Sequence, residues 1–179
     1  MNATTLSPAA RIDGLLSHQT TVWLSTVTPD GAPHLVPIWF SWDGTRLFIA
    51  SKPGARKVRN LRDNPRLMLA LGEPDDDFDV GLVEAEAVIP EATTRDLLPA
   101  GHLAKYRDRM RGIALSDDEY LDTYSQPILV TPTRFLPWHG RTTPPSAAAA
   151  GTGVRSALGQ AAERLVGWLM PRRTLPATA

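Results

Sequence analysis

The chain of 179 residues carries 19 basic and 19 acidic residues, so its formal net charge is zero and no broad basic surface for nucleic acid is indicated. It contains no cysteine, which excludes disulfide frameworks and cysteine-ligated zinc or iron–sulfur sites. The first residues lack the pattern of a signal peptide, and no apolar run approaches the ~20 residues of a membrane span. We therefore expect a cytoplasmic protein that does not span a membrane and does not bind nucleic acid.

The beginning of the chain predicts a short helix and then a strand. Ser7 and Pro8 are typical of a helix N-cap followed by proline at the first helical position, and apolar residues at helical spacing follow. Residues 20–28 are rich in β-branched side chains and predict a strand. A cluster of turn-forming residues at 29–33 closes that strand.

The next stretch predicts a β-hairpin. Residues 34–42 are rich in aromatic and branched side chains, although Pro37 restricts part of this strand to a sheet edge or a bulge. Asp43 and Gly44 give a strong hairpin-turn signal. Residues 45–51 alternate as a half-buried returning strand should.

A basic helix follows the hairpin and carries Arg56 and Lys57 in its first turn. Two cations at the positive end of a helix dipole are electrostatically unfavourable unless an anion binds there. Val58 and Leu61 share the apolar face of this helix, which leaves Asn60 and the two cations free to point elsewhere. We interpret the segment as a phosphate site, the alternative being that these are ordinary solvated helix residues.

The remaining strands lie in the second half of the chain. Residues 66–71 form a near-continuous apolar run, which is suited to a strand buried on both faces. Residues 79–89 and 127–135 predict two further strands, the last of which tolerates Pro132 only at an edge or a bulge. With the earlier strands these make about six, a number typical of a sandwich or a small barrel filled by its own side chains.

Short helices are expected between the last two strands. Residues 91–112 have a helical pattern that is broken at 99–101, and Ser116 with Glu119 forms a capping-box signature for another helix. The histidines are too isolated for a metal site, and the acidic run at 75–77 lacks the pattern of a calcium loop. We therefore expect no metal and interpret that run as a solvated turn.

The composition changes near the end of the chain. Residues 1–141 are expected to form the folded domain, and residues 142–153 a low-complexity linker that is too poor in large apolar groups to fold alone. Residues 154–179 predict an amphipathic helix followed by a tail.

Three stretches carry a resemblance to a known family: VWLSTVTPDGAPHLVPIWFSWDG, LFIASKPGARKVRNLRDNPRLMLAL and YSQPILVTPTRFLPWHG. They resemble the pyridoxamine 5′-phosphate oxidase-like superfamily, and in particular its flavin and deazaflavin oxidoreductases that use coenzyme F420. The resemblance covers residues 16–140. It implies a mainly β fold, a six-stranded antiparallel split β-barrel (the FMN-binding split barrel) with short peripheral helices.

The resemblance also implies which residues bind the cofactor. They belong to the strand along the flavin or deazaflavin edge, to the end of the next strand and to the basic helix: Val36, Pro37, Ile38, Trp39, Phe40, Ser41, Ala50, Ser51, Arg56 and Lys57. Val36 and Ser41 stand where true pyridoxamine 5′-phosphate oxidases have Arg and Lys. The loss of both cations favours coenzyme F420 over FMN with a phosphorylated substrate.

The activity that the resemblance implies is an F420-dependent oxidoreductase, which transfers hydride between the deazaflavin and an unsaturated small molecule. No side chain is marked as a catalytic acid or nucleophile, which fits chemistry supplied by the cofactor. A homodimer is expected, with the cofactor at the subunit boundary. The alternatives are an FMN-dependent pyridoxamine 5′-phosphate oxidase-like oxidase or reductase, and a non-catalytic flavin-binding barrel.

Overall fold

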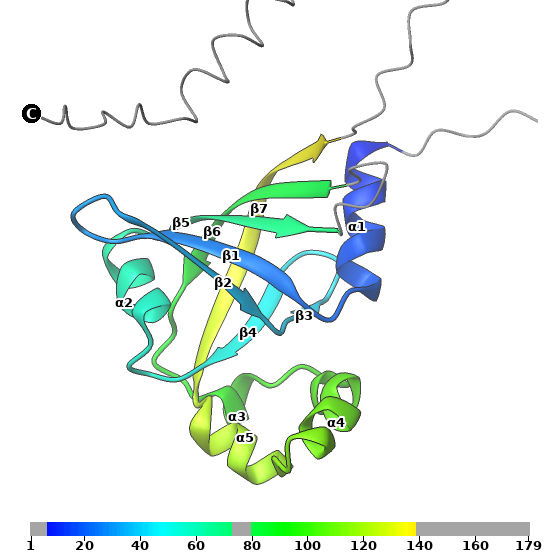
Figure 1. Ribbon diagram of the computed structural model, residues 1–179, viewed down its shortest axis with the longest axis vertical. Coiled ribbons are helices and arrows are strands. Elements are labelled where there is room, and N and C mark those ends of the chain that lie inside the picture. Colours follow the sequence, from blue (N-terminus) through cyan, green and yellow to red (C-terminus); the bar gives the residue numbers. More distant parts are fainter. Residues whose placement is uncertain (1–6, 73–79, 139–179) are drawn as a thin grey trace, which may run out of the picture. The chain divides into compact units, whose positions relative to one another are not determined.

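A computed structural model describes residues 7–72 and 80–138 of the chain (Figure 1). The expected linker at 142–153 and the C-terminal helix and tail at 154–179 lie outside the described residues, as does the acidic run at 75–77. Among the helices that are described, none is both long and apolar enough to cross a membrane.

One antiparallel sheet forms the body of the fold. Its strands are β1 (Val22–Val27), β2 (Pro33–Ile38), β3 (Ser41–Trp42), β4 (Leu47–Ser51), β5 (Arg66–Leu71), β6 (Val80–Val88) and β7 (Gln126–Trp138). Their order across the sheet is β2-β1-β5-β6-β7-β4-β3. Only Trp39 and Phe40 join β2 to β3, the two edge strands, so the sheet has to curl until its edges adjoin.

This curled sheet confirms the predicted mainly β, antiparallel split barrel with short helices. The strand count differs from the prediction, since seven strands are present where six were expected. The difference arises at residues 34–42, which were expected as one strand. Trp39 and Phe40 interrupt this run, because the chain there steps from one edge of the sheet to the other.

Helices cover the sheet at its two ends (Figure 1). They are α1 (Pro8–His18), α2 (Arg56–Asp63), α3 (Thr94–Leu97), α4 (His102–Gly112) and α5 (Asp117–Thr123). As predicted, the Ser7 hydroxyl caps α1 by accepting from the N–H of Ala10 at 3.2 Å, and Pro8 occupies its first turn. The predicted capping box of α5 is also present, between Ser116 and Glu119.

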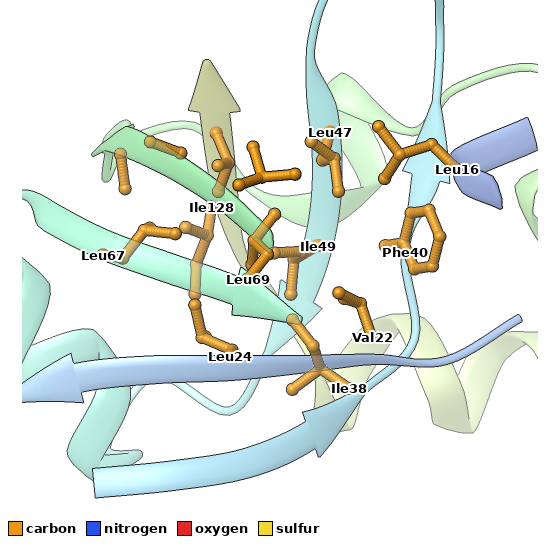
Figure 2. Packing of buried hydrophobic residues seen from close by; sticks show 14 of the residues in the cluster. Leu16, Val22, Leu24, Ile38, Phe40, Leu47, Ile49, Leu67, Leu69 and Ile128 are labelled. Carbon is orange, nitrogen blue, oxygen red and sulfur yellow. The ribbon is translucent and has the colours of Figure 1, made fainter. Parts of the chain in front are cut away.

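Alternate residues of the strands fill the barrel interior. Figure 2 shows Val22, Leu24, Ile49, Leu69 and Ile128 converging from four different strands, and each of these side chains is fully buried. Such an interior is closely packed by the protein's own side chains. The interior therefore leaves no room for a flat ligand such as the expected cofactor.

Prolines in the strands lie where a missing N–H is tolerated, as the sequence predicted. β2, which contains Pro37, is an edge strand of the sheet. Along β7, Glu84 pairs with Arg134 and Ala85 with Pro132, so one residue is skipped and the strand has a bulge beside the proline.

Three expectations about burial were wrong. The returning strand at 45–51 is not half-buried, because Leu47 and Ile49 fill the core while Phe48, on the other face, is covered by His102. The strand at 66–71 is not buried on both faces, because Arg66 and Met68 point outward and only the alternate residues enter the core. Asn60 does not point away from the core but is buried, and its amide donates to the Thr26 hydroxyl at 3.0 Å. This bond satisfies two polar groups beneath α2, where both would otherwise be buried without partners.

The helical segment α4–α5 packs around a second buried cluster, formed by Tyr106, Met110, Tyr120 and Leu121. Tyr106 ties this cluster to the sheet. Its hydroxyl accepts a hydrogen bond from the N–H of Phe40 at 2.8 Å and lies 2.6 Å from the carbonyl oxygen of the same residue, to which it donates. These hydrogen bonds attach the two-residue connection between the edge strands to α4.

A buried histidine makes a second connection between these layers. His102 is 1% exposed, its Nδ1 lies 2.8 Å from the Ser41 hydroxyl, and its Nε2 lies 2.8 Å from the Tyr120 hydroxyl. A neutral imidazole satisfies both hydroxyls by donating to one and accepting from the other. Burial, and then the charge of Lys105, lower the pKa of His102 from 6.5 to about 4.

The low pKa of His102 predicts an acid-sensitive fold. The unfolded chain binds more protons than the folded one between pH 6.5 and about 4, so the free energy of unfolding should fall as the pH is lowered through this window. The loss is on the order of 3 kcal/mol when each pKa unit counts about 1.36 kcal/mol. His102→Gln should flatten this dependence in urea-unfolding curves. Parallel pH dependences of the variant and the wild-type protein would contradict the assignment.

Candidate functional site

A cavity of about 210 Å³ lies beside the edge strand β2, and we call it the Trp39 cavity. It brings together five of the ten predicted site residues, Pro37, Ile38, Trp39, Ala50 and Lys57. Its remaining wall is formed by four residues from the helical segment, Ile113, Leu115, Tyr120 and Tyr124. The cavity therefore lies between the sheet edge, the first turn of α2 and the segment α4–α5.

Aromatic rings give this cavity a flat apolar wall. Trp39 stacks on Tyr106 with the ring centroids 4.6 Å apart and the planes 3° from parallel, and its ring lies 6.1 Å from that of Tyr120. Burial raises the pKa of the Tyr120 hydroxyl, which stays neutral. A rigid wall of this kind suits one face of a planar, largely apolar ligand.

A positive charge without a counter-ion borders the aromatic wall. Lys57 is half-buried, and its pKa is lowered by that burial and by the charge of Lys52. Among the described residues no carboxylate lies within ion-pair distance of Lys57. The N-terminus of α2 at Ala55 has no side-chain cap, and its first turn has no acidic residue. The helix dipole and Lys57 therefore favour an anion at the same place.

His34, on the edge strand β2, is half-buried beside these cations. Its pKa is lowered by burial and then by the charges of Arg56 and Lys57. Its Nδ1 is buried and finds no hydrogen-bond partner within the described part of the chain. An unsatisfied buried nitrogen costs on the order of 1–3 kcal/mol, which a ligand or a second chain would recover by bonding to it.

The other five predicted residues do not line the Trp39 cavity: Val36, Phe40, Ser41, Ser51 and Arg56. Phe40 is buried in the barrel core, and its backbone groups are already bonded to Tyr106. Ser41 lines a different cavity and bonds to His102. Ser51 is fully buried, and Arg56 is exposed on the first turn of α2.

Sequence reasoning missed the wall that the helical segment provides. Ile113, Leu115, Tyr120 and Tyr124 lie far along the chain from β2, and no local pattern marks them as ligand contacts. The only signal was the capping box at Ser116, which predicts the helix but not the surface against which it packs. No group of three histidine or acidic residues able to hold a metal ion occurs within 7–72 and 80–138.

Comparison with known proteins adds to this geometry. The family model described as pyridoxamine 5′-phosphate oxidase matches residues 9–139. No curated protein matches the sequence. A solved F420 reductase is similar to this chain, with 29% identity, a TM-score of 0.55, and coverage of 69% of this chain and 94% of that one.

Two further structures share the fold at lower identity. A conserved hypothetical protein from Mycobacterium tuberculosis is 24% identical, with a TM-score of 0.60, and the match covers 88% of this chain and 99% of that one. The heme storage protein from Vibrio cholerae is 19% identical, with a TM-score of 0.55 and coverage of 72% and 92%. The family model matches well over half of this chain. The chain therefore belongs to the pyridoxamine 5′-phosphate oxidase family.

Proposed function

We propose that this protein is an F420-dependent oxidoreductase that transfers hydride between the deazaflavin and an unsaturated small molecule. The proposal rests on one observation, that the Trp39 cavity joins a flat aromatic wall to a desolvated lysine at a helix N-terminus. A planar ring carrying a phosphate has both of these chemical features. The 29% identity to an F420 reductase supports this choice of cofactor.

In this proposal each part of the site has a distinct role. Trp39 and Tyr120 present the wall on which the planar ring packs, and Pro37 and Ile38 form the sheet side of the same cavity. Lys57, with Arg56 and the first turn of α2, whose N–H groups no side chain caps, holds the phosphate. When bound, the cofactor supplies the hydride, while the apolar lining keeps water from the reacting atoms.

Two positions favour a deazaflavin over FMN with a phosphorylated substrate. Val36 is half-buried and packs against the barrel core, so it contributes no charge. The Ser41 hydroxyl is engaged by His102 at 2.8 Å and is likewise neutral. Neither residue provides the cation that the oxidase pattern has at its position, so the site has less positive charge for two phosphates.

A second copy of the chain would complete this site. A volume of about 210 Å³ is below the roughly 300–1,000 Å³ typical of ligand pockets, so a flavin-sized cofactor needs another wall. The outer face of the sheet carries exposed apolar side chains: Trp23 (47% exposed), Val27 (36%), Leu35 (57%) and Met68 (38%). We call these four residues the β1–β2 patch.

The β1–β2 patch is contiguous and borders the cavity. Ser25 pairs with Leu35 on one side and with Met68 on the other, and Trp23 pairs with Pro37, which lines the Trp39 cavity. Exposed apolar patches of this kind mark association surfaces. We propose a homodimer in which this face of one copy covers the cavity of the other.

Lys57→Ala should weaken F420 binding by roughly ten- to a hundred-fold, because a charge-assisted contact to phosphate is worth on the order of 1.5–3 kcal/mol. Arg62→Ala is the matched control, since Arg62 lies in the last turn of the same helix. Fluorescence titration of F420, repeated with FMN, measures the dissociation constants. An unchanged constant in Lys57→Ala would remove this lysine from the site.

Leu35→Glu should convert the proposed dimer to a monomer at micromolar concentration, because it places a charge at the most exposed residue of the β1–β2 patch. Val88→Glu is the control, since Val88 is 62% exposed but lies outside the patch. Sedimentation velocity measures the oligomeric state. A wild-type protein that sediments as a monomer and still binds the cofactor tightly would rule out the shared site.

Reduced F420, mixed with the protein and a panel of enones, quinones and tetrapyrroles, should be reoxidised by at least one acceptor. Reoxidation is followed at the visible absorption band of F420. The control reaction contains pyridoxamine 5′-phosphate, FMN and oxygen. Turnover only in that control would refute the deazaflavin proposal in favour of an oxidase, and cofactor binding without any turnover would favour a non-catalytic barrel.

A further inference from the structure

A second and larger cavity, of about 710 Å³, lies at the β3–β4 hairpin, and we call it the Trp42 cavity. It shares no lining residue with the Trp39 cavity. Apolar side chains form much of its wall, among them Leu16 from α1, Phe48 from β4 and Leu129 from β7. Its volume lies within the roughly 300–1,000 Å³ of typical small-molecule sites.

One side of this cavity carries a lysine without a counter-ion. Lys105 is half-buried, and burial lowers its pKa. Its ammonium group donates to the carbonyl oxygen of Phe40 at 3.1 Å and lies 4.3 Å from the centroid of the Phe40 ring. These contacts hold the side chain in place, yet no carboxylate in the described part of the chain lies within ion-pair distance of it.

The other charged groups of the cavity do not neutralise Lys105. Asp43 is the acidic residue of the lining, but its Oδ1 accepts from the N–H groups of Thr45 and Arg46, at 2.8 and 2.7 Å, and so closes the hairpin turn. Arg46 adds a second cation to the lining. The lining therefore has two positive charges and one negative charge, and the negative one bonds to the turn backbone and interacts with the charge of Arg46.

Neutral polar groups complete this wall. Ser41 lines the cavity, and its hydroxyl bonds to His102, which is uncharged near neutral pH because of its burial. The hydroxyl offers a ligand a hydrogen bond without a competing charge. An occupant of this cavity therefore meets an apolar surface, a neutral hydroxyl and an ammonium group that lacks an anion.

We propose that the Trp42 cavity binds an organic carboxylate with an apolar body. Its carboxylate pairs with Lys105, and its apolar part packs against Phe48 and Leu129. This site is separate from the proposed cofactor site and does not depend on F420 chemistry. Binding is favoured because the ammonium is already desolvated and positioned, so that pairing it costs little further ordering.

Naphthoate and its neutral counterpart naphthalenemethanol test this proposal on the full chain. The indole N–H of Trp42 donates to Asp13 Oδ1 at 2.7 Å and lines the cavity, so its NMR resonance reports binding there. Trp39 reports the other cavity in the same spectrum. Naphthoate should shift the Trp42 resonance with at least tenfold higher affinity than the alcohol. Equal responses to the acid and the alcohol, or shifts confined to Trp39, would overturn the proposal.

Charge variants separate the two cavities. Lys105→Met, which keeps an apolar stem, should weaken naphthoate binding by about tenfold or more, and Lys105→Arg should retain it. Lys57→Met is the matched control in the Trp39 cavity and should leave the Trp42 response unchanged. A Lys105→Met protein that binds naphthoate like the wild type would overturn the proposal. If that variant fails to fold, the comparison of acid and alcohol on the wild-type chain still decides the matter.

Discussion

The arrangement of both cavities depends on the hydrogen bonds between the Tyr106 hydroxyl and the backbone of Phe40. Phe40 belongs to the two-residue step that joins the edges of the curled sheet, so its N–H and C=O have no strand partner there. Burying them unpaired would cost about as much as two lost hydrogen bonds. Two side chains of α4 satisfy these groups, since the Tyr106 hydroxyl bonds to both and the Lys105 ammonium also donates to the C=O at 3.1 Å. The helical segment is thereby fixed against the barrel.

This attachment also decides which side chain faces which cavity. Trp39, the residue before Phe40, stacks on Tyr106 and lines the Trp39 cavity. Ser41, the residue after Phe40, lines the Trp42 cavity. Each cavity has a half-buried lysine whose pKa is lowered by burial, Lys57 in one and Lys105 in the other. In both places the described part of the chain partly buries a cation without placing a carboxylate within ion-pair distance of it, an arrangement that is more common at binding sites than in structural cores.

The sequence predicted most of what depends on residues close together in the chain. The cap at Ser7, the capping box at Ser116 and the first strand with its β-branched residues depend on neighbours within a few residues, so local patterns reveal them. The outward orientation of Met68 was not predictable, because an apolar run does not show which face of a strand another layer will cover.

The candidate site was predicted only in part, because local patterns reveal only features that depend on residues close together in the chain. Lys57 was identified because a basic helix start is visible in a short stretch, and Trp39 was identified through the family resemblance. The break at Trp39 and Phe40, beyond which Ser41 lines a different cavity, arises where the sheet closes on itself, which no short stretch encodes. The wall formed by Tyr120 and Tyr124 comes from a segment more than sixty residues away.

The edges of the sheet have a further consequence for how copies of this chain meet. β2 contains Pro33 and Pro37, so a foreign strand laid along it finds two positions without an N–H donor. The opposite edge, β3, is only two residues long and offers little backbone to pair with. Both edges are therefore poor templates for adding strands, the route by which β-proteins polymerise. The apolar face of β1 and β2 is thus left to side-chain contacts, which do not extend the sheet from one molecule to the next.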